Sequence, residues 1–280
     1  MSVNKKKRNI KKTTKQLKNF TILGIGIAVL LIVLLLYLVF ANRGDYYKVD
    51  SRVDKVDSSK KFKDTDYRTI AWLRVQGTKI DLPIIHSDDP TKEFPVDVEK
   101  FAWSENEDVG FHNMIRIQGH NVFNLSSHPE KSGDNFTRFE ELMSFIYYDF
   151  AKDNKYIQYT IDGKDYVYKI FSTSFVSKAK KTFTPDEDDV SKKTIKTQIE
   201  GFKENSIYDY DVDVNENDKI ITLATCTRFY GPNDGYYFYV VGRLLRDGEK
   251  IDNYKVTKNK SYNKIEKILK GDEENEEDNA

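Results

Sequence analysis

The sequence predicts a mostly β protein, a barrel with a few peripheral helices, preceded by one transmembrane helix. Short runs of strand-forming residues recur from Tyr67 to Leu245 with turn residues between them, and only two stretches there show helical spacing. Strands and helices do not alternate, which argues against a parallel sheet with crossover helices. An uncharged apolar run from Phe20 to Ala41 predicts the membrane span.

The N-terminal region has the composition of an uncleaved membrane anchor. Residues 1–19 hold eight Lys or Arg and no acidic residue, and the apolar run that follows covers residues 20–41. A helix of that length spans about 33 Å, against roughly 30 Å of hydrocarbon, whereas the apolar core of a cleaved signal peptide is only about 7–15 residues long. We therefore expect a cytoplasmic tail over 1–19, a single-pass anchor over 20–41 that contacts the lipid bilayer, and an external remainder.

The external part is acidic. Eight of the 45 Lys and Arg lie in residues 1–19, which leaves 37 basic against 45 acidic residues. This balance argues against nucleic acid as a partner, because nucleic-acid binding requires a clustered basic surface. We expect a stalk or short helices over 42–66, one domain over 67–250, and a C-terminal extension over 251–280 that ends in a disordered acidic tail.

Seven segments of the domain have strand character. Asp162-Gly163 predicts a tight hairpin turn between two of them, and Pro83 marks an edge or a bulge. The expected strands are Ile70–Val75, Ile80–Ile85, Met114–Gln118, Tyr156–Ile161, Tyr166–Ser174, Lys219–Cys226 and Tyr236–Leu245. The two expected helices are Asn135–Ala151 and Val190–Lys203.

Cys226 is the only cysteine, and it ends an apolar, β-branched strand. It cannot form an intrachain disulfide, so it is an inert buried thiol, an intermolecular link, or a nucleophile that needs a histidine. Among the four histidines, His120 also sits where a strand meets a loop, after Gly119. Two strand ends can meet at one rim of a barrel, which is the geometry that a Cys-His pair requires. We assign no role to His86, His112 or His128.

Several segments resemble the sortase family. Thr222–Cys226 looks like the family's TLxTC signature, and Gln118–Asn121 resembles the segment that carries its histidine. Ile70–Ile85 resembles the opening pair of strands, and Val241–Leu244 the close of the last strand, so the likeness covers about residues 67–246. The long segment before the Cys226 strand, with its helix at Val190–Lys203, and the N-terminal helical region resemble class B.

The resemblance implies a closed eight-stranded barrel and a membrane-anchored cysteine transpeptidase on a Gram-positive cell surface. Cys226 would attack the Thr carbonyl of a C-terminal sorting motif, with His120 as acid and base. The partners would be surface proteins that carry sorting signals, and an amine from a lipid II-type cell-wall precursor or a pilin. No cofactor is implied. The Val190–Lys203 helix is the expected wall of a partly covered groove.

One position departs from the family pattern. Sortases use an arginine on the last strand to bind substrate and steady the oxyanion, and the equivalent position here is Tyr237. Arg228 could supply the cation instead, Tyr237 could donate a neutral hydrogen bond, and Thr225 is a further candidate for contact with substrate. We expect Arg228 to matter more, because a cation stabilises an oxyanion more strongly than a phenol does.

The same residues also fit two other classes of function. A secreted cysteine hydrolase would share the Cys-His pair, although papain-like enzymes place Cys before His in the chain. A non-catalytic surface adhesin on the same barrel would explain the absent arginine. The acidic run 186–189 lacks the spaced ligands and the turn glycine of a Ca²⁺ loop, so we expect no metal site.

Overall fold

The structure is a computed structural model that describes residues 24–34, 47–61, 67–86, 101–105, 110–119, 138–178, 191–231 and 235–270. The chain divides into two units, residues 1–46 and 47–280, which are described separately. In the first unit, residues 24–34 form a helix with exposed side chains. No helix among the described residues combines the length and the apolar character that crossing a membrane demands. The other residues of the expected span 20–41 lie outside the described residues.

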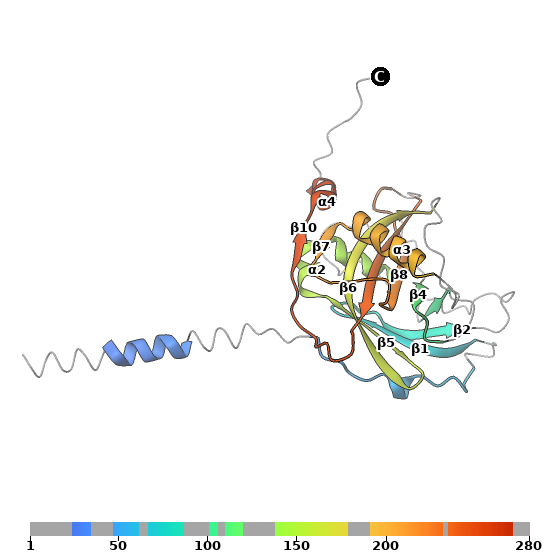
Figure 1. Cartoon of the computed structure of the whole chain (residues 1–280), viewed down its shortest axis with the longest axis horizontal. Coiled ribbons are helices and arrows are strands. Elements are labelled where there is room, and N and C mark those ends of the chain that lie inside the picture. The colour runs from blue at the N-terminus through green and yellow to red at the C-terminus, as the bar shows by residue number, and fades with distance from the viewer. Residues whose placement is uncertain are drawn as a thin grey trace, which may run out of the picture. The chain divides into compact units, whose positions relative to one another are not determined.

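Eight strands of the second unit close into a barrel, as expected (Figure 1). Their order around the barrel is β1-β2-β3-β4-β8-β9-β6-β5. The strands are β1 (Arg68–Val75), β2 (Asp81–His86), β3 (Ala102–Ser104), β4 (Met114–Gly119), β5 (Tyr156–Ile161), β6 (Lys164–Ser177), β8 (Ile220–Cys226) and β9 (Tyr236–Leu244). All seven expected strands are confirmed, with small differences at their ends, and β3 is an eighth that the sequence did not predict.

Most neighbouring strands run antiparallel, but two pairs, β2 with β3 and β4 with β8, run parallel. The hairpin between β5 and β6 turns at Asp162 and Gly163, which both have positive φ angles, of 52° and 69°. Positive φ at both central residues is typical of the tight turn that matches the twist of two strands, so the predicted hairpin is confirmed.

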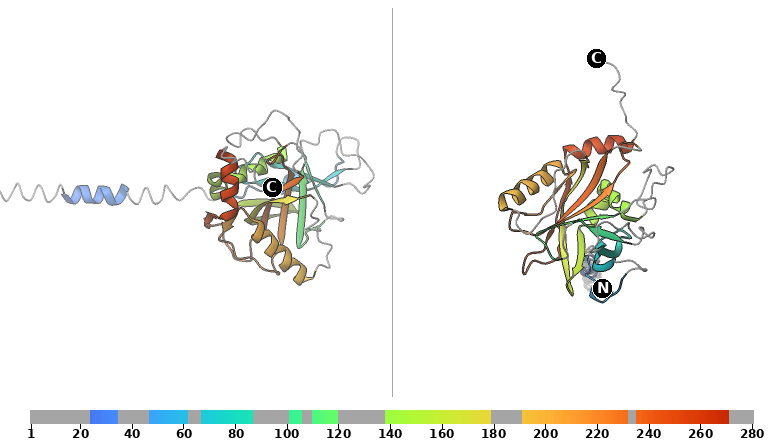
Figure 2. Two further views of the ribbon diagram at one scale, coloured as in Figure 1. Left: turned by 90° about the horizontal axis from the view of Figure 1, so that it is seen from above. Right: turned by 90° about the vertical axis from the view of Figure 1, so that its right-hand side faces the viewer.

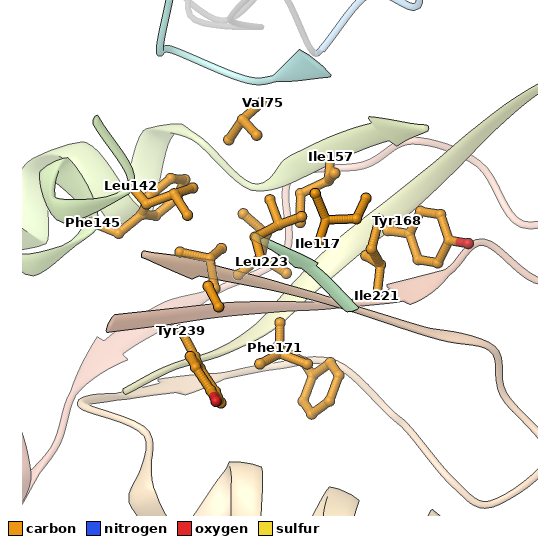
Figure 3. Close-up of a cluster of buried hydrophobic side chains, with 14 of the residues drawn as sticks. Val75, Ile117, Leu142, Phe145, Ile157, Tyr168, Phe171, Ile221, Leu223 and Tyr239 are labelled. Atoms are coloured by element: carbon orange, nitrogen blue, oxygen red, sulfur yellow. The ribbon is translucent and has the colours of Figure 1, made fainter. Parts of the chain in front are cut away.

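Apolar side chains fill the barrel. Ile117 of β4, Ile157 of β5 and Leu223 of β8 are fully buried and lie in the same apolar cluster as Val75 of β1 (Figure 3). Tyr239 lies on the other side of the β8 and β9 ribbons, on the outer face of the wall (Figure 3). This inside-outside alternation follows from the two-residue period of a strand, and it decides which residues share a face with Cys226.

The helices lie outside the strands (Figure 2). The expected helix Asn135–Ala151 is a 3-10 helix, η3 (Arg138–Ile146), followed by a short α2 (Tyr148–Asp153). The other expected helix is α3 (Lys192–Asn205), with Ser191 as its N-cap. It packs on β6, where the Ser172 hydroxyl donates to the carbonyl of Phe202 at 2.7 Å.

The segments on either side of the barrel strands also pack on the barrel. Within the expected stalk 42–66, which holds the short η1 (Val53–Lys55), Tyr47 is buried and stacks on Tyr156, with ring centroids 5.7 Å apart. Arg52 pairs with Asp81 of β2 at 2.6 Å.

The C-terminal extension 251–280 contains two elements that the sequence analysis missed, β10 (Val256–Lys258) and α4 (Lys260–Lys270). β10 pairs with β7 (Tyr208–Tyr210) in a small separate sheet. The expected acidic tail from residue 271 lies outside the described residues.

Candidate active site

Cys226 is the last residue of β8, and its side chain is partly exposed. It forms no disulfide. Tyr237 of β9 lies directly opposite Cys226 in the antiparallel ladder, so the two side chains share the outer face of the wall. The barrel therefore presents the single thiol at a strand end, beside a tyrosine.

The strand that leads to His120 ends on the same side of the barrel as Cys226. β4 and β8 are parallel neighbours, with Gln118 opposite Ala224, so their C-terminal ends lie together. β4 ends at Gly119, where the backbone approaches η3 so closely that a Cβ atom would lie 2.3 Å from Cγ of Phe139. His120 itself lies outside the described residues.

Thr225 lies on the opposite face of β8. Its side chain is fully buried, and it pairs with Phe238, which is also fully buried. Successive strand residues alternate between faces, so Thr225 points away from the face that carries Cys226. The structure therefore brings Tyr237, and not the Thr225 side chain, to the face of the thiol.

Arg228 is directed to η3. Its guanidinium Nη2 lies 3.8 Å from Oε1 of Glu140, and the two side chains are only 15% and 11% exposed. Burial raises the pKa of Glu140, and Arg228 opposes that rise by favouring the charged carboxylate. The turn that follows β8 is closed by the amide of Gly231, which donates to the Arg228 carbonyl at 3.0 Å.

The outer face beside Cys226 carries an aromatic pair with two cations. Tyr237 and Tyr239 stack with ring centroids 6.1 Å apart. The Arg116 guanidinium lies 5.8 Å from the Tyr237 centroid and 5.2 Å from that of Tyr239, and Lys178 lies 5.2 Å from Tyr237. Burial raises the pKa of Tyr239 to about 12, although the charge of Arg116 acts to lower it. Arg116 also pairs with Glu105, with Nε 2.7 Å from Oε2.

Sequence reasoning did not identify Arg116, Glu105, Glu140 or Lys178 as neighbours of the site. A signal for Arg116 was present, because it is a charged residue inside the apolar strand Met114–Gly119, two positions before Gln118. No feature of the sequence pointed to Glu140, because its partner Arg228 is far away in the chain. Within the part of the chain that the structure describes, no group of three or more His, Cys, Asp or Glu is placed to hold a metal ion.

A family model for the sortase domain matches residues 73–245 of this chain. The chain belongs to the sortase family. The match agrees with the expected extent of about 67–246. Sortases are a family of cysteine transpeptidases.

The similar proteins are class B enzymes, as the sequence suggested. Sortase B of Staphylococcus aureus (strain NCTC 8325 / PS 47) is 25% identical over 166 residues, which cover 58% of this chain and 64% of that protein. The match thus covers slightly less than two thirds of that relative's length.

Two solved structures share the fold. The crystal structure of S. aureus sortase B has a TM-score of 0.52 at 20% identity and covers 69% of this chain and 85% of that one. Clostridium perfringens sortase B has a TM-score of 0.51 at 23% identity and covers 65% of this chain and 94% of that one.

Proposed function

We propose that this sortase is a membrane-anchored, class B-like transpeptidase that cleaves a C-terminal sorting motif after Thr and transfers the acyl group to an amine. The observation that carries the proposal is the common strand end of β4 and β8, which places Cys226 beside the strand that leads directly to His120. The acceptor would be a lipid II-type cell-wall precursor or a pilin amine. S. aureus sortase B, similar in fold at a TM-score of 0.51, has been solved as a complex with its substrate.

The reaction would proceed through a thioester. The Cys226 thiolate attacks the Thr carbonyl, the sulfur–carbon bond forms, and the peptide carbon–nitrogen bond breaks as His120 gives a proton to the leaving amine. The acceptor amine then attacks the thioester carbonyl, its carbon–nitrogen bond forms as the carbon–sulfur bond breaks and releases the Cys226 thiolate, and the amine proton goes to His120. One amide replaces another, so the thioester conserves the acyl-transfer potential and no ATP is required outside the cell.

Cysteine and histidine substitutions test this mechanism. We expect Cys226→Ala to abolish acyl transfer and His120→Ala to lower it by several orders of magnitude, with non-additive effects, because both act in the same steps. The substrates would be peptides from the C-termini of proteins of the same genome that end in a motif, an apolar span and a basic tail. Mass spectrometry should show a covalent adduct on Cys226.

His86→Ala provides the matched control, since this histidine ends β2 and has no proposed role. Near-normal turnover of Cys226→Ala would refute the mechanism. Hydrolysis without any amine adduct at high amine concentration would favour the hydrolase alternative. An unreactive thiol that forms no adduct with any of the peptides would favour a surface binding protein built on the sortase fold.

The proposed topology has residues 1–19 in the cytoplasm, an anchor over 20–41, a stalk over 42–66, and the catalytic domain 67–250 with the extension 251–280 outside. The eight N-terminal bases support it, because basic flanks resist translocation. Protease added to intact cells stripped of their wall should remove the domain. Its survival until the cells are lysed would reverse the orientation.

A further inference from the structure

The face that carries Cys226 holds a half-buried cation from β4, Arg116. Arg116 is opposite Thr222 in the parallel ladder of β4 and β8, and Thr222 lies four positions before Cys226 on β8. Because every second residue of a strand faces the same side, Arg116, Thr222 and Cys226 all face outward. The Arg116 side chain is only 14% exposed, so solvent screens its charge incompletely.

Arg116 meets β9 residues across the intervening strand. β8 lies between β4 and β9, yet the guanidinium lies 5.2 Å from the Tyr239 ring centroid and 5.8 Å from that of Tyr237. The residue of β8 opposite Tyr239 is Ala224, whose small, fully buried side chain leaves room for this contact. The Arg116 guanidinium therefore extends from β4 toward the side chains of β9, where Tyr237 lies opposite Cys226.

The carboxylate that pairs with Arg116 lies on the other side of β4. Glu105 follows β3, and β3 borders β4 on the side away from β8. The guanidinium therefore lies between a carboxylate on the β3 side and two tyrosine rings on the β9 side. Arg228, the other half-buried arginine near the thiol, is directed instead to Glu140 of η3.

We propose that Arg116 is a positioning residue of this site, which supplies positive potential to the face of Cys226 and holds the Tyr237 ring opposite the nucleophile. The role rests on the proposed function, in which negative charge develops first on the thiolate and then on the oxyanion. A cation held in place by Glu105 and two rings stabilises such charge without reorganisation. Tyr237 stays a candidate for the neutral hydrogen-bond donor on the last strand.

The potential at Cys226 can be measured without a substrate. Cys226 is the only cysteine, so methanethiosulfonate reagents label this position alone in the full-length protein. The ratio of the labelling rates of the anionic sulfonatoethyl reagent and the cationic trimethylammonioethyl reagent reports the local potential, because thiolate fraction and access affect both rates similarly. We expect Arg116→Gln to lower the anionic-to-cationic ratio at least about threefold.

Five further variants show whether the effect belongs to the charge of Arg116. Arg116→Lys should retain most of the anionic-to-cationic labelling ratio. Glu105→Gln should raise this ratio, because the substitution removes the opposing negative charge. Arg74→Gln is the matched control, since Arg74 makes the same kind of contact, 5.2 Å from the Tyr47 ring, on β1. An unchanged ratio in Arg116→Gln, or a larger fall in Arg228→Gln or Lys178→Gln, would overturn the proposal.

A second measurement separates this inference from the proposed function. In single-turnover thioester formation, Arg116→Gln and Tyr237→Phe should each slow the reaction, and the double variant should be little slower than Arg116→Gln, because the arginine acts partly through the tyrosine. Additive effects would contradict that coupling. If the wild type forms no thioester, the proposed function fails, but the labelling ratio still decides the role of Arg116.

Discussion

At the scale of single residues, Gly119 is the position where the barrel strand β4 ends, next to the candidate site. It ends β4 just before His120, and a Cβ atom there would lie 2.3 Å from Cγ of Phe139. No side chain fits without movement of η3, whose residues also fill the end of the barrel. The glycine therefore has a steric role here, namely to let η3 pack against the end of β4.

We expect Gly119→Ala to destabilise the protein by about 1–3 kcal/mol, because the added methyl group overpacks the contact with Phe139. It should also slow thioester formation, since the shift occurs beside His120. Denaturant unfolding gives the free energy, and single-turnover kinetics give the rate.

Gly201→Ala is the matched control. Gly201 lies in α3, and a Cβ atom there meets nothing within 4 Å. Alanine should stabilise that helix by about 0.5–1 kcal/mol without an effect on the rate. If the Gly119→Ala variant and the wild type have equal free energies of unfolding, η3 can move to accommodate the methyl group without a loss of stability.

At the scale of elements, the sequence predicted strands whose residues alternate or form long apolar runs, such as β5 and β8, nearly to the residue. It missed β3, β7 and β10, which have three residues each. So short a segment carries no period of its own, and its pairing partners decide its conformation. The described part of the predicted helix over 135–151 is the 3-10 helix η3 followed by the short α2, and tertiary packing of buried side chains such as Phe139 and Leu142 routinely overrides helix propensity.

The candidate site also contains residues that the sequence predicted and residues that it did not. Cys226 and His120 were predicted because each lies in a motif that is local in the sequence. Arg116 and Glu140 were not, because their significance arises from partners, Tyr239 and Arg228, that only strand order brings near. Arg228 was preferred because a cation stabilises an oxyanion more strongly than a phenol does, and the sequence does not reveal that a carboxylate on η3 pairs with it. Whether Arg228 or Tyr237 acts on substrate stays a prediction.

At the scale of the whole molecule, a partly buried ion cluster connects the C-terminal segment to the barrel. Glu249 bonds Arg243 of β9 and lies 2.8 Å from Nζ of Lys169 on β6, which also pairs with Asp252 at 2.8 Å. Both cations are buried. Burial alone would raise the pKa of Glu249, but hydrogen bonds from Arg243 and Lys169 lower it to about 2.

This lowered pKa predicts a loss of stability in acid. Because the folded-state pKa lies below the ordinary value of 4.5, the stabilisation is complete above about pH 4.5 and is lost as the pH falls toward 2. The Glu249 side chain is 24% exposed, and the shift corresponds to about 3 kcal/mol. We expect Glu249→Gln to lower the free energy of unfolding by about that amount at pH 7, and the difference from wild type to shrink by about half by pH 3.

Denaturant unfolding at pH 7, 5 and 3 measures this difference. Glu266→Gln is the control, because Glu266 pairs with Lys258 and Lys270 on the surface of the C-terminal region, where exposed ion pairs contribute little. It should change stability little at any of the three pH values. A Glu249→Gln variant that stays below wild type by the same amount at pH 3 as at pH 7 would show that the loss comes from packing and not from the charge of Glu249, because only the charge is removed by protonation.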